Sequence, residues 1–192
     1  MDDVCIRSAA LSDAERLLEI YAWYVEHTAV SFEYDVPSLA AFRERMEQTL
    51  RRGPYLVAER GGRVLGYACA GPYAARAAYA WSCELSVYLD RAERGHGLGR
   101  RLYETLEAAL AEMGVQNLYA CIAWPEREDE YLTRDSARFH ARLGFAEAGH
   151  FHRCGCKFGR WYDVVWMEKL IGEHGGDLSP VRFRNGSRRD GG

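Results

Sequence analysis

Three glycines, Gly95, Gly97 and Gly99, lie within five positions, immediately after an apolar stretch and before a helix-like one. In the first turn of a helix the backbone N–H groups lack intrahelical acceptors, and the helix dipole adds partial positive charge there. Glycines remove the side chains that would keep a phosphate away from those amides. The spacing therefore predicts a turn that binds a phosphate or diphosphate through its main chain.

Two well-known phosphate motifs do not fit this turn. A P-loop requires Lys followed by Ser or Thr after its last glycine, and Arg100 and Arg101 stand there instead. A dinucleotide fingerprint would need its third glycine at Arg100. The pattern that remains is R-x-x-G-x-G, formed by Arg94, Gly97 and Gly99. Glycine turns also precede helices without any ligand, so this motif alone does not decide the chemistry.

A single carboxylate, Glu84, interrupts the apolar run WSCELSVYL just before the glycine turn. Burial of an unpaired carboxylate costs several kcal/mol or raises its pKa by up to ~3–5 units. Perturbed carboxylates of this kind are common at catalytic centres, where they serve as general bases. The alternatives are a structural pair with an arginine and a side chain that simply faces water.

Metal-capable side chains alternate along HFHRCGC, at His150, His152, Cys154 and Cys156. On one strand all four would point to the same face. Residues two apart in a strand are separated by roughly 7 Å, which prevents four consecutive ligands from closing on one tetrahedral zinc. We therefore expect an ordinary strand here and no metal.

The elements that would position these residues follow from hydrophobic periodicity. Helices are predicted after Ser12 or Asp13, after Pro37, and over residues 99–113 and 136–143. Strands are predicted at Cys5, as a hairpin over 55–71, and over 78–90, 117–123, 151–158 and 161–170. The last two strands are too close in sequence for a helical crossover, so they must pair antiparallel. This order predicts one α/β domain over 1–172 with a mixed sheet, followed by a disordered polar tail over 173–192.

Composition excludes several classes of protein. The 192 residues, 48% of them hydrophobic, suffice for one core, and a net charge of −3 gives no general attraction for nucleic acid or an anionic membrane. Neither a membrane-spanning run nor an export signal is apparent, so we expect a cytoplasmic protein with no nucleic-acid or membrane partner. The six cysteines are accordingly expected to be reduced. The charge run at 125–130 is interpreted as a solvated loop.

Several stretches together resemble the phosphinothricin N-acetyltransferase branch of the GCN5-related N-acetyltransferase (GNAT) superfamily, over residues 6–170: R-x-x-G-x-G, TAVSFEYDVP, AGPYAARAAYAWSCELSVYL, SARFHARLGF and GCKFGRWYDVVWMEKL. The resemblance implies the GNAT fold, with a central mixed, mostly antiparallel sheet, a splayed middle strand and flanking helices. It also implies acetyl-CoA as cosubstrate, no metal, a homodimer, and an acceptor such as phosphinothricin or methionine sulfoximine. The segment from Pro125 to Thr133 is longer than that branch usually has.

The resemblance further implies roles for individual residues. Glu84 takes the position of the catalytic base, the N–H of Val87 polarises the thioester carbonyl, and His140 stands where superfamily members often have a tyrosine acid, although a structural role fits it equally. The expected cofactor-binding residues are Val87, Tyr88, Leu89, Arg94, Gly95, His96, Gly97, Leu98, Gly99, Arg100 and Ser136. The expected substrate-binding residues are Phe32, Arg76 and Tyr79, of which the arginine suits a carboxylate or phosphinate.

Two other functions fit the same residues. One is an N-acetyltransferase for a different amine, such as a polyamine, an antibiotic or a protein N-terminus. The other is a coenzyme A sensor without catalysis, which would be indifferent to the loss of the Glu84 carboxylate.

Overall fold

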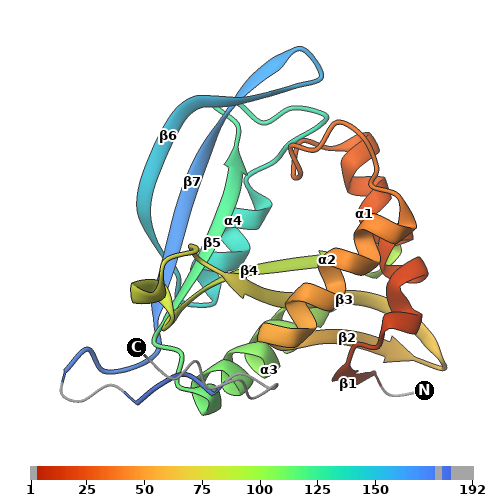
Figure 1. The fold of residues 1–192 in the computed structure, drawn as a ribbon. Coiled ribbons are helices and arrows are strands. Elements are labelled where there is room, and N and C mark those ends of the chain that lie inside the picture. The colour runs from red at the N-terminus through yellow and green to blue at the C-terminus, as the bar shows by residue number, and fades with distance from the viewer. Residues whose placement is uncertain (1–3, 176–178, 183–192) are drawn as a thin grey trace.

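The computed structural model describes residues 4–175 and 179–182. Within this part of the chain, seven strands form one sheet in the order β1-β2-β3-β4-β5-β7-β6, and helices cover both faces (Figure 1). The strands are β1 (Cys5–Ser8), β2 (Tyr55–Arg60), β3 (Arg63–Pro72), β4 (Ser82–Leu89), β5 (Asn117–Trp124), β6 (Ala146–Lys157) and β7 (Arg160–Leu170). The helices are α1 (Ala14–His27), α2 (Leu39–Arg52), α3 (Leu98–Met113) and α4 (Asp135–Arg142). Only β4 and β5 pair in parallel, which confirms the predicted mixed, mostly antiparallel sheet.

Local chemistry explains where the helices begin and end. The hydroxyl of Ser38 accepts from the N–H of Ala41 at 3.2 Å and caps α2. Asp13 precedes α1 but does not cap it, because its carboxylate accepts from the N–H of Ala10 at 2.8 Å and pairs with an arginine. α3 ends at Gly114, whose φ of 92° favours glycine.

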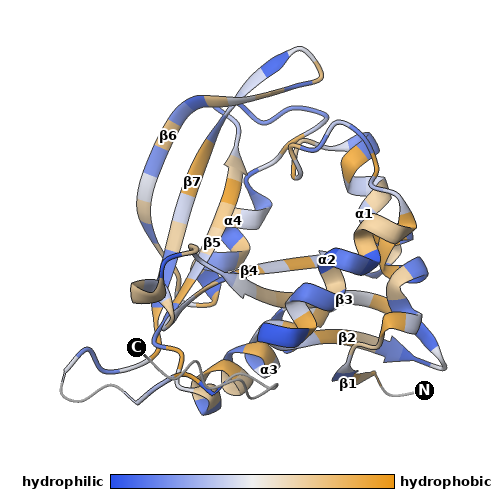
Figure 2. Ribbon diagram, in the orientation of Figure 1, coloured by the Kyte–Doolittle hydropathy of each residue, from blue (hydrophilic) through white to orange (hydrophobic). Residues whose placement is uncertain are grey.

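Two apolar cores lie on opposite faces of the sheet, where apolar strand residues meet the apolar stripes of the helices (Figure 2). The core under α1 and α2 includes Leu17, Ile20, Phe42, Met46, Val57 and Tyr67. The core under α3 and α4 includes Leu85, Leu102, Leu106, Leu110, Leu118 and Ile122. Alternate residues of β4 therefore face different layers, which matters for the site described below.

β4 and β5 separate along their length. β4 stays paired with β3 as far as Leu89, and β5 stays paired with β7 as far as Trp124. The two strands pair with each other only at their beginnings, the last pair being Glu84 with Tyr119. The predicted splay of the middle strand is thus confirmed, and it leaves the facing edges of β4 and β5 without strand partners.

The hairpin of β6 and β7 is less regular than expected. The register shifts between Phe151 and Gly155, and Arg153 has a φ of 48°. A bulge of this kind inserts extra residues on one strand and changes the direction of the side chains that follow. The bulge interrupts the simple alternation of the two histidines and two cysteines, and the imidazoles of His150 and His152 meet Asp163 of β7 in a cluster that includes neither cysteine.

The charge run at 125–130 is a loop whose charged side chains are mostly exposed, as interpreted, but Asp129 anchors it to the domain. The carboxylate of Asp129 accepts from the N–H groups of Tyr131 and Leu132, both at 2.9 Å, and from the hydroxyl of Tyr162 at 3.0 Å. Arg160 of β7 lies 2.9 Å from the same carboxylate. These contacts fix a segment that the composition alone could only describe as charged.

Part of the predicted tail contacts the domain. The N–H of Arg182 donates to the carbonyl of Met113 at 2.9 Å, and the indole of Trp81 donates to the carbonyl of Ser179 at 3.0 Å. Residues 176–178 and 183–192 lie outside the described residues, so the predicted disorder of that part of the tail is not tested. No helix in the described part of the chain combines the length and the apolar character needed to cross a membrane.

Candidate active site

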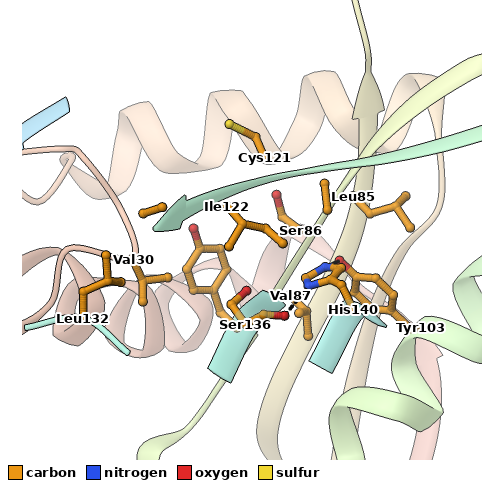
Figure 3. Close-up of a pocket in the computed structure, with 13 residues that line it drawn as sticks. Val30, Leu85, Ser86, Val87, Tyr103, Cys121, Ile122, Leu132, Ser136 and His140 are labelled. Atoms are coloured by element: carbon orange, nitrogen blue, oxygen red, sulfur yellow. Dashed lines mark hydrogen bonds between the residues drawn. The ribbon is translucent and has the colours of Figure 1, made fainter. Parts of the chain in front are cut away.

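A pocket occupies the gap between the diverging strands β4 and β5 (Figure 3). It holds about 470 Å³ of empty space, including its open mouth. Both strands contribute walls, and α4 and two loops close the sides; the lining residues are Val30, Leu85, Ser86, Val87, Tyr88, Tyr103, Ala120, Cys121, Ile122, Ala123, Leu132, Ser136 and His140. Four predicted site residues therefore lie together: Val87, Tyr88, Ser136 and His140.

The main chain of Val87 faces this gap. Along β4 the N–H of Asp90 and the carbonyl of Ser82 bond toward β3, so even-numbered residues direct their backbone groups to that neighbour. In an antiparallel ladder the intervening residues direct theirs to the other side. The N–H and carbonyl of Val87 are therefore turned toward β5, where no strand lies close enough to use them. Leu89 shares this direction, but its carbonyl already accepts from the hydroxyl of Tyr24 at 2.7 Å.

Glu84 lies where the two strands part. It is the last residue of β4 that pairs with β5, and its side chain is on the face opposite Leu85. Burial raises the pKa of the Glu84 carboxyl. No hydrogen bond or ion pair joins this carboxylate to another residue that the structure describes. A half-buried carboxylate without a partner is a suitable acceptor for a substrate proton.

His140 is buried and hydrogen-bonded at both nitrogens. Its Nδ1 lies 2.7 Å from the carbonyl oxygen of Ser136, and its Nε2 lies 2.9 Å from the hydroxyl of Tyr103. A carbonyl only accepts, so Nδ1 carries the proton and Nε2 of the neutral ring accepts from Tyr103. Burial lowers the pKa of His140 and favours this neutral form. The ring thus has no spare proton to direct into the gap.

The glycine turn joins β4 to α3. Gly95 and Gly97 have φ values of 82° and 76°, in the left-handed region that favours glycine, and a Cβ added at either would meet nothing within 4 Å. The main chain of the turn is consequently open to a ligand, together with the first-turn amides of α3 at Leu98, Gly99 and Arg100. Gly99 serves packing, because a Cβ there would lie 3.2 Å from the ring of Phe139.

The charged side chains of the turn point in different directions. The guanidinium of Arg94 lies over the rings of Trp23 and Tyr24 of α1, at 5.5 and 5.1 Å from their centroids. It therefore braces the turn against α1 rather than projecting from it. Arg100 approaches Glu104 one turn further along α3, and His96 is exposed.

Two of the predicted substrate-binding residues, Arg76 and Tyr79, belong to the short turn that precedes β4. The ring of Tyr79 packs edge-on against Tyr73 at 5.5 Å, and Tyr73 stacks on Tyr119 at 4.3 Å. Tyr119 is the strand partner of Glu84, so this chain of rings ends at the strand position beside Glu84. Arg76 is exposed and has no ion pair among the described residues, which leaves its guanidinium available to an anion.

The third, Phe32, lies behind the pocket wall rather than in it. Its ring stacks on Tyr162 at 6.4 Å and covers Gly155, where an added Cβ would lie 2.1 Å from the ring. The pocket itself is lined from this side by Val30 and Leu132. Phe32 therefore packs behind the part of the pocket wall that is formed by Val30, two residues earlier in the chain.

A buried lysine holds the loop that carries this wall. The ammonium of Lys157 donates to the carbonyl oxygens of Val25, Thr28 and Ser31, at 2.7, 2.9 and 2.7 Å. These carbonyls belong to the last turn of α1 and to the loop after it, so one cation from β6 fixes the course of the chain there. Sequence reasoning assigned no role to this lysine beyond its place in a motif.

Several pocket residues were missed by sequence reasoning: Val30, Ser86, Tyr103, Cys121 and Leu132. Tyr103 continues the apolar stripe of α3, so nothing distinguishes it from the core. Ser86 was within reach, because the period of two along a strand places it on the face of Glu84.

Comparison with known proteins agrees with this geometry. The family model for the acetyltransferase (GNAT) domain matches residues 6–166. A phosphinothricin N-acetyltransferase of Streptomyces coelicolor is 34% identical over 173 residues, covering 88% of this chain and 97% of that protein. An L-methionine sulfoximine/L-methionine sulfone acetyltransferase of Salmonella typhimurium is 33% identical over 172 residues, covering 88% and 95%. A crystal structure of a GNAT superfamily phosphinothricin acetyltransferase from Sinorhizobium meliloti, in complex with AcCoA, matches with a TM-score of 0.82 at 30% identity, covering 93% of each chain. The chain belongs to the GNAT family of acetyltransferases.

Proposed function

We propose that this protein is an acetyl-CoA-dependent N-acetyltransferase that acetylates the amine of a small amino acid analogue of the phosphinothricin or methionine sulfoximine type. The observation that carries the proposal is the gap between β4 and β5, with an open glycine turn following β4 and a half-buried carboxylate where the strands part. The names of the relatives support the acceptor class.

Main-chain groups bind the cosubstrate, acetyl-CoA. Acetyl-CoA, when bound, supplies the acetyl group as a thioester. The amides of residues 94–100 present donors to its diphosphate, as helix N-termini do for anions. The N–H and carbonyl of Val87 face the gap and suit an extended amide-containing arm laid alongside β4, with Tyr88, Leu89 and Ser136 at its walls.

Glu84 accepts the proton that the amine loses. An amine is mostly protonated near neutral pH and must lose a proton before its lone pair can attack the thioester carbonyl. The raised pKa of Glu84 brings the carboxylate closer to the working pH, which makes it a better base there. As the amine attacks, charge grows on the carbonyl oxygen, and the N–H of Val87 is the donor placed to stabilise it.

The leaving thiolate requires no acid from this site. His140 has its one ring proton tied to Ser136, so we assign it a positioning role, in which it holds Tyr103 at the wall of the gap. Recognition of the acceptor falls to Arg76 and Tyr79 on one side and to Val30, backed by Phe32, on the other. An arginine fork matches the carboxylate or phosphinate of the proposed acceptors.

The remaining expectations complete the proposal. Residues 1–172 constitute one domain, and the protein acts in the cytoplasm as a homodimer. Exposed aromatic side chains on the β6–β7 hairpin, Phe151 and Trp161, are 55% and 64% exposed and support association there. Light scattering of the full chain tests this part, since a monomer at micromolar concentration would contradict it.

Release of free coenzyme A thiol tests the function. The full chain is mixed with acetyl-CoA and, separately, with phosphinothricin, methionine sulfoximine, spermidine and a peptide with a free N-terminus. The proposal expects release with the two amino acid analogues at a kcat/KM well above that with the other amines. Release only with spermidine or the peptide would overturn the acceptor class, and no release with any amine would overturn the activity.

A further inference from the structure

A cluster of two imidazoles and one carboxylate lies on the β6–β7 hairpin, outside the pocket. The Nε2 of His150 is 2.8 Å from Oδ2 of Asp163, and the Nδ1 of His152 is 3.4 Å from the same oxygen. The three potential ligand atoms all lie within 4.8 Å of one another. Ligand atoms bound to one zinc ion at about 2.0–2.2 Å lie roughly 3.3–3.6 Å apart, so a small movement of the exposed His152 ring would complete the arrangement.

A backbone hydrogen bond orients the carboxylate of Asp163 toward the two imidazoles. The N–H of Arg153, at the bulge of β6, donates to Oδ1 of Asp163 at 2.7 Å. This bond fixes the plane of the carboxylate and leaves Oδ2 directed at both imidazoles. Glu147 lies 3.9 Å from Nδ1 of His150 and can accept a proton there when Nε2 is used as a ligand. Support of a ligating histidine by a second carboxylate is a common feature of metal sites.

The cluster has a closed side and an open side. The side chain of Asp163 is only 12% exposed and that of His150 27%, whereas that of His152 is 78% exposed. The ring of Trp124 packs edge-on against His150 and forms part of the closed side. An ion would therefore approach from solvent past His152 and retain one open position for water.

The cluster is separate from the acetyl-transfer pocket. None of its three residues lines that pocket. Asp163 lies on the same face of β7 as Val165 and Met167, whose side chains belong to the core under α3 and α4. Glu84 faces the opposite side of the sheet. Acetyl transfer needs no metal, so an ion at this cluster would act on the hairpin and not on the reaction.

We propose that His150, His152 and Asp163 form a binding site for a divalent transition-metal ion of the Zn²⁺ or Co²⁺ type. Two imidazole nitrogens with one carboxylate oxygen favour such ions over Mg²⁺ and Ca²⁺, which prefer sets made of oxygen alone. Binding moves the His150 proton to Nδ1 and replaces its hydrogen bond to Asp163 with metal–ligand bonds. The ion thereby ties the bulged part of β6 to β7.

Calorimetric titration of the metal-stripped full chain with Zn²⁺, and absorption spectroscopy with Co²⁺, test the proposal. The expected result is one ion per chain and a higher melting temperature with Zn²⁺. His152→Ala removes an exposed ligand, and the expected result is a loss of affinity of at least about tenfold. His27→Ala, at an exposed histidine of α1, is the matched control and leaves the affinity unchanged.

A second variant separates ligation from folding. Asp163→Asn keeps an oxygen for the N–H of Arg153 but weakens the ligand, and it too should lose affinity at least about tenfold. Equal affinity in the parent and His152→Ala would overturn the proposal. So would a thiolate-to-cobalt charge-transfer band, which would identify Cys154 or Cys156 as the ligand, and so would the absence of Zn²⁺ binding at micromolar concentrations.

Discussion

Replacement of the buried Lys157 by methionine tests the claim that one cation shapes the acceptor side of the pocket. Lysine and methionine have similar length, so Lys157→Met removes the ammonium with little change in packing. The ammonium donates to three backbone carbonyls at 2.7–2.9 Å and is almost inaccessible to solvent. The variant leaves those three acceptors in place with nothing to bond them.

The magnitude follows from these bonds. A hydrogen bond to a charged group contributes about 1.5–3 kcal/mol, so three contribute roughly 4.5–9 kcal/mol. The desolvation of the ammonium, which the variant no longer requires, offsets several kcal/mol of this. The lost hydrogen bonds outweigh the recovered desolvation cost, so we expect the free energy of unfolding to fall by about 2–4 kcal/mol.

Chemical denaturation and steady-state kinetics measure the two consequences. Because the lysine holds the loop that carries Val30, the KM for the amine should rise while the KM for acetyl-CoA changes little. Lys169→Met is the matched control: Lys169 pairs with Glu107 at 2.7 Å on a partly exposed surface, and its loss should cost under about 1 kcal/mol. Equal destabilisation of the two variants, or an unchanged KM for the amine, would refute the reasoning.

Three further substitutions probe other parts of the site. Gly97→Ala forces a residue with a side chain into a φ of 76° and adds a methyl group at the turn, so the KM for acetyl-CoA should rise severalfold with kcat nearly constant in initial-rate assays. Gly155→Ala places a methyl group where the ring of Phe32 lies, so calorimetry should show a lower melting temperature and kinetics a higher KM for the amine. His140→Asn can keep the bond to the carbonyl of Ser136 and should reduce kcat less than tenfold, whereas loss of a general acid would reduce it by about 10²–10⁴.

The helices, the strands and the glycine turn could be predicted from the sequence, because hydrophobic periodicity and glycines are local signals. The glycine turn, the helix after it and the closely spaced final strands each follow from residues near one another in the chain. The splay of β4 and β5 came only through the family resemblance, since no local pattern shows where two parallel strands stop pairing. Glu84 was found because a carboxylate within an apolar strand is conspicuous.

Long-range contacts account for what sequence reasoning missed. Nothing near Lys157 in the chain reveals carbonyl groups that lie more than a hundred residues earlier. The anchoring of the acidic loop was missed for the same reason, because Asp129 pairs with Arg160, which lies at the start of β7. Asp163 likewise meets two histidines because β6 pairs antiparallel with β7, a register that nothing near Asp163 in the chain reveals.

The pH dependence of kcat/KM for the amine, in the parent and in Glu84→Gln, tests the central claim most directly. A base works when deprotonated, and burial raises the pKa of Glu84, so the rate of the parent should rise with pH through a value above the usual glutamate pKa of about 4.3. The account predicts that Glu84→Gln loses this limb and about 10²–10⁴ in kcat while its affinity for acetyl-CoA, measured by calorimetry, is unchanged. A variant that keeps both the limb and the turnover of the parent would contradict it.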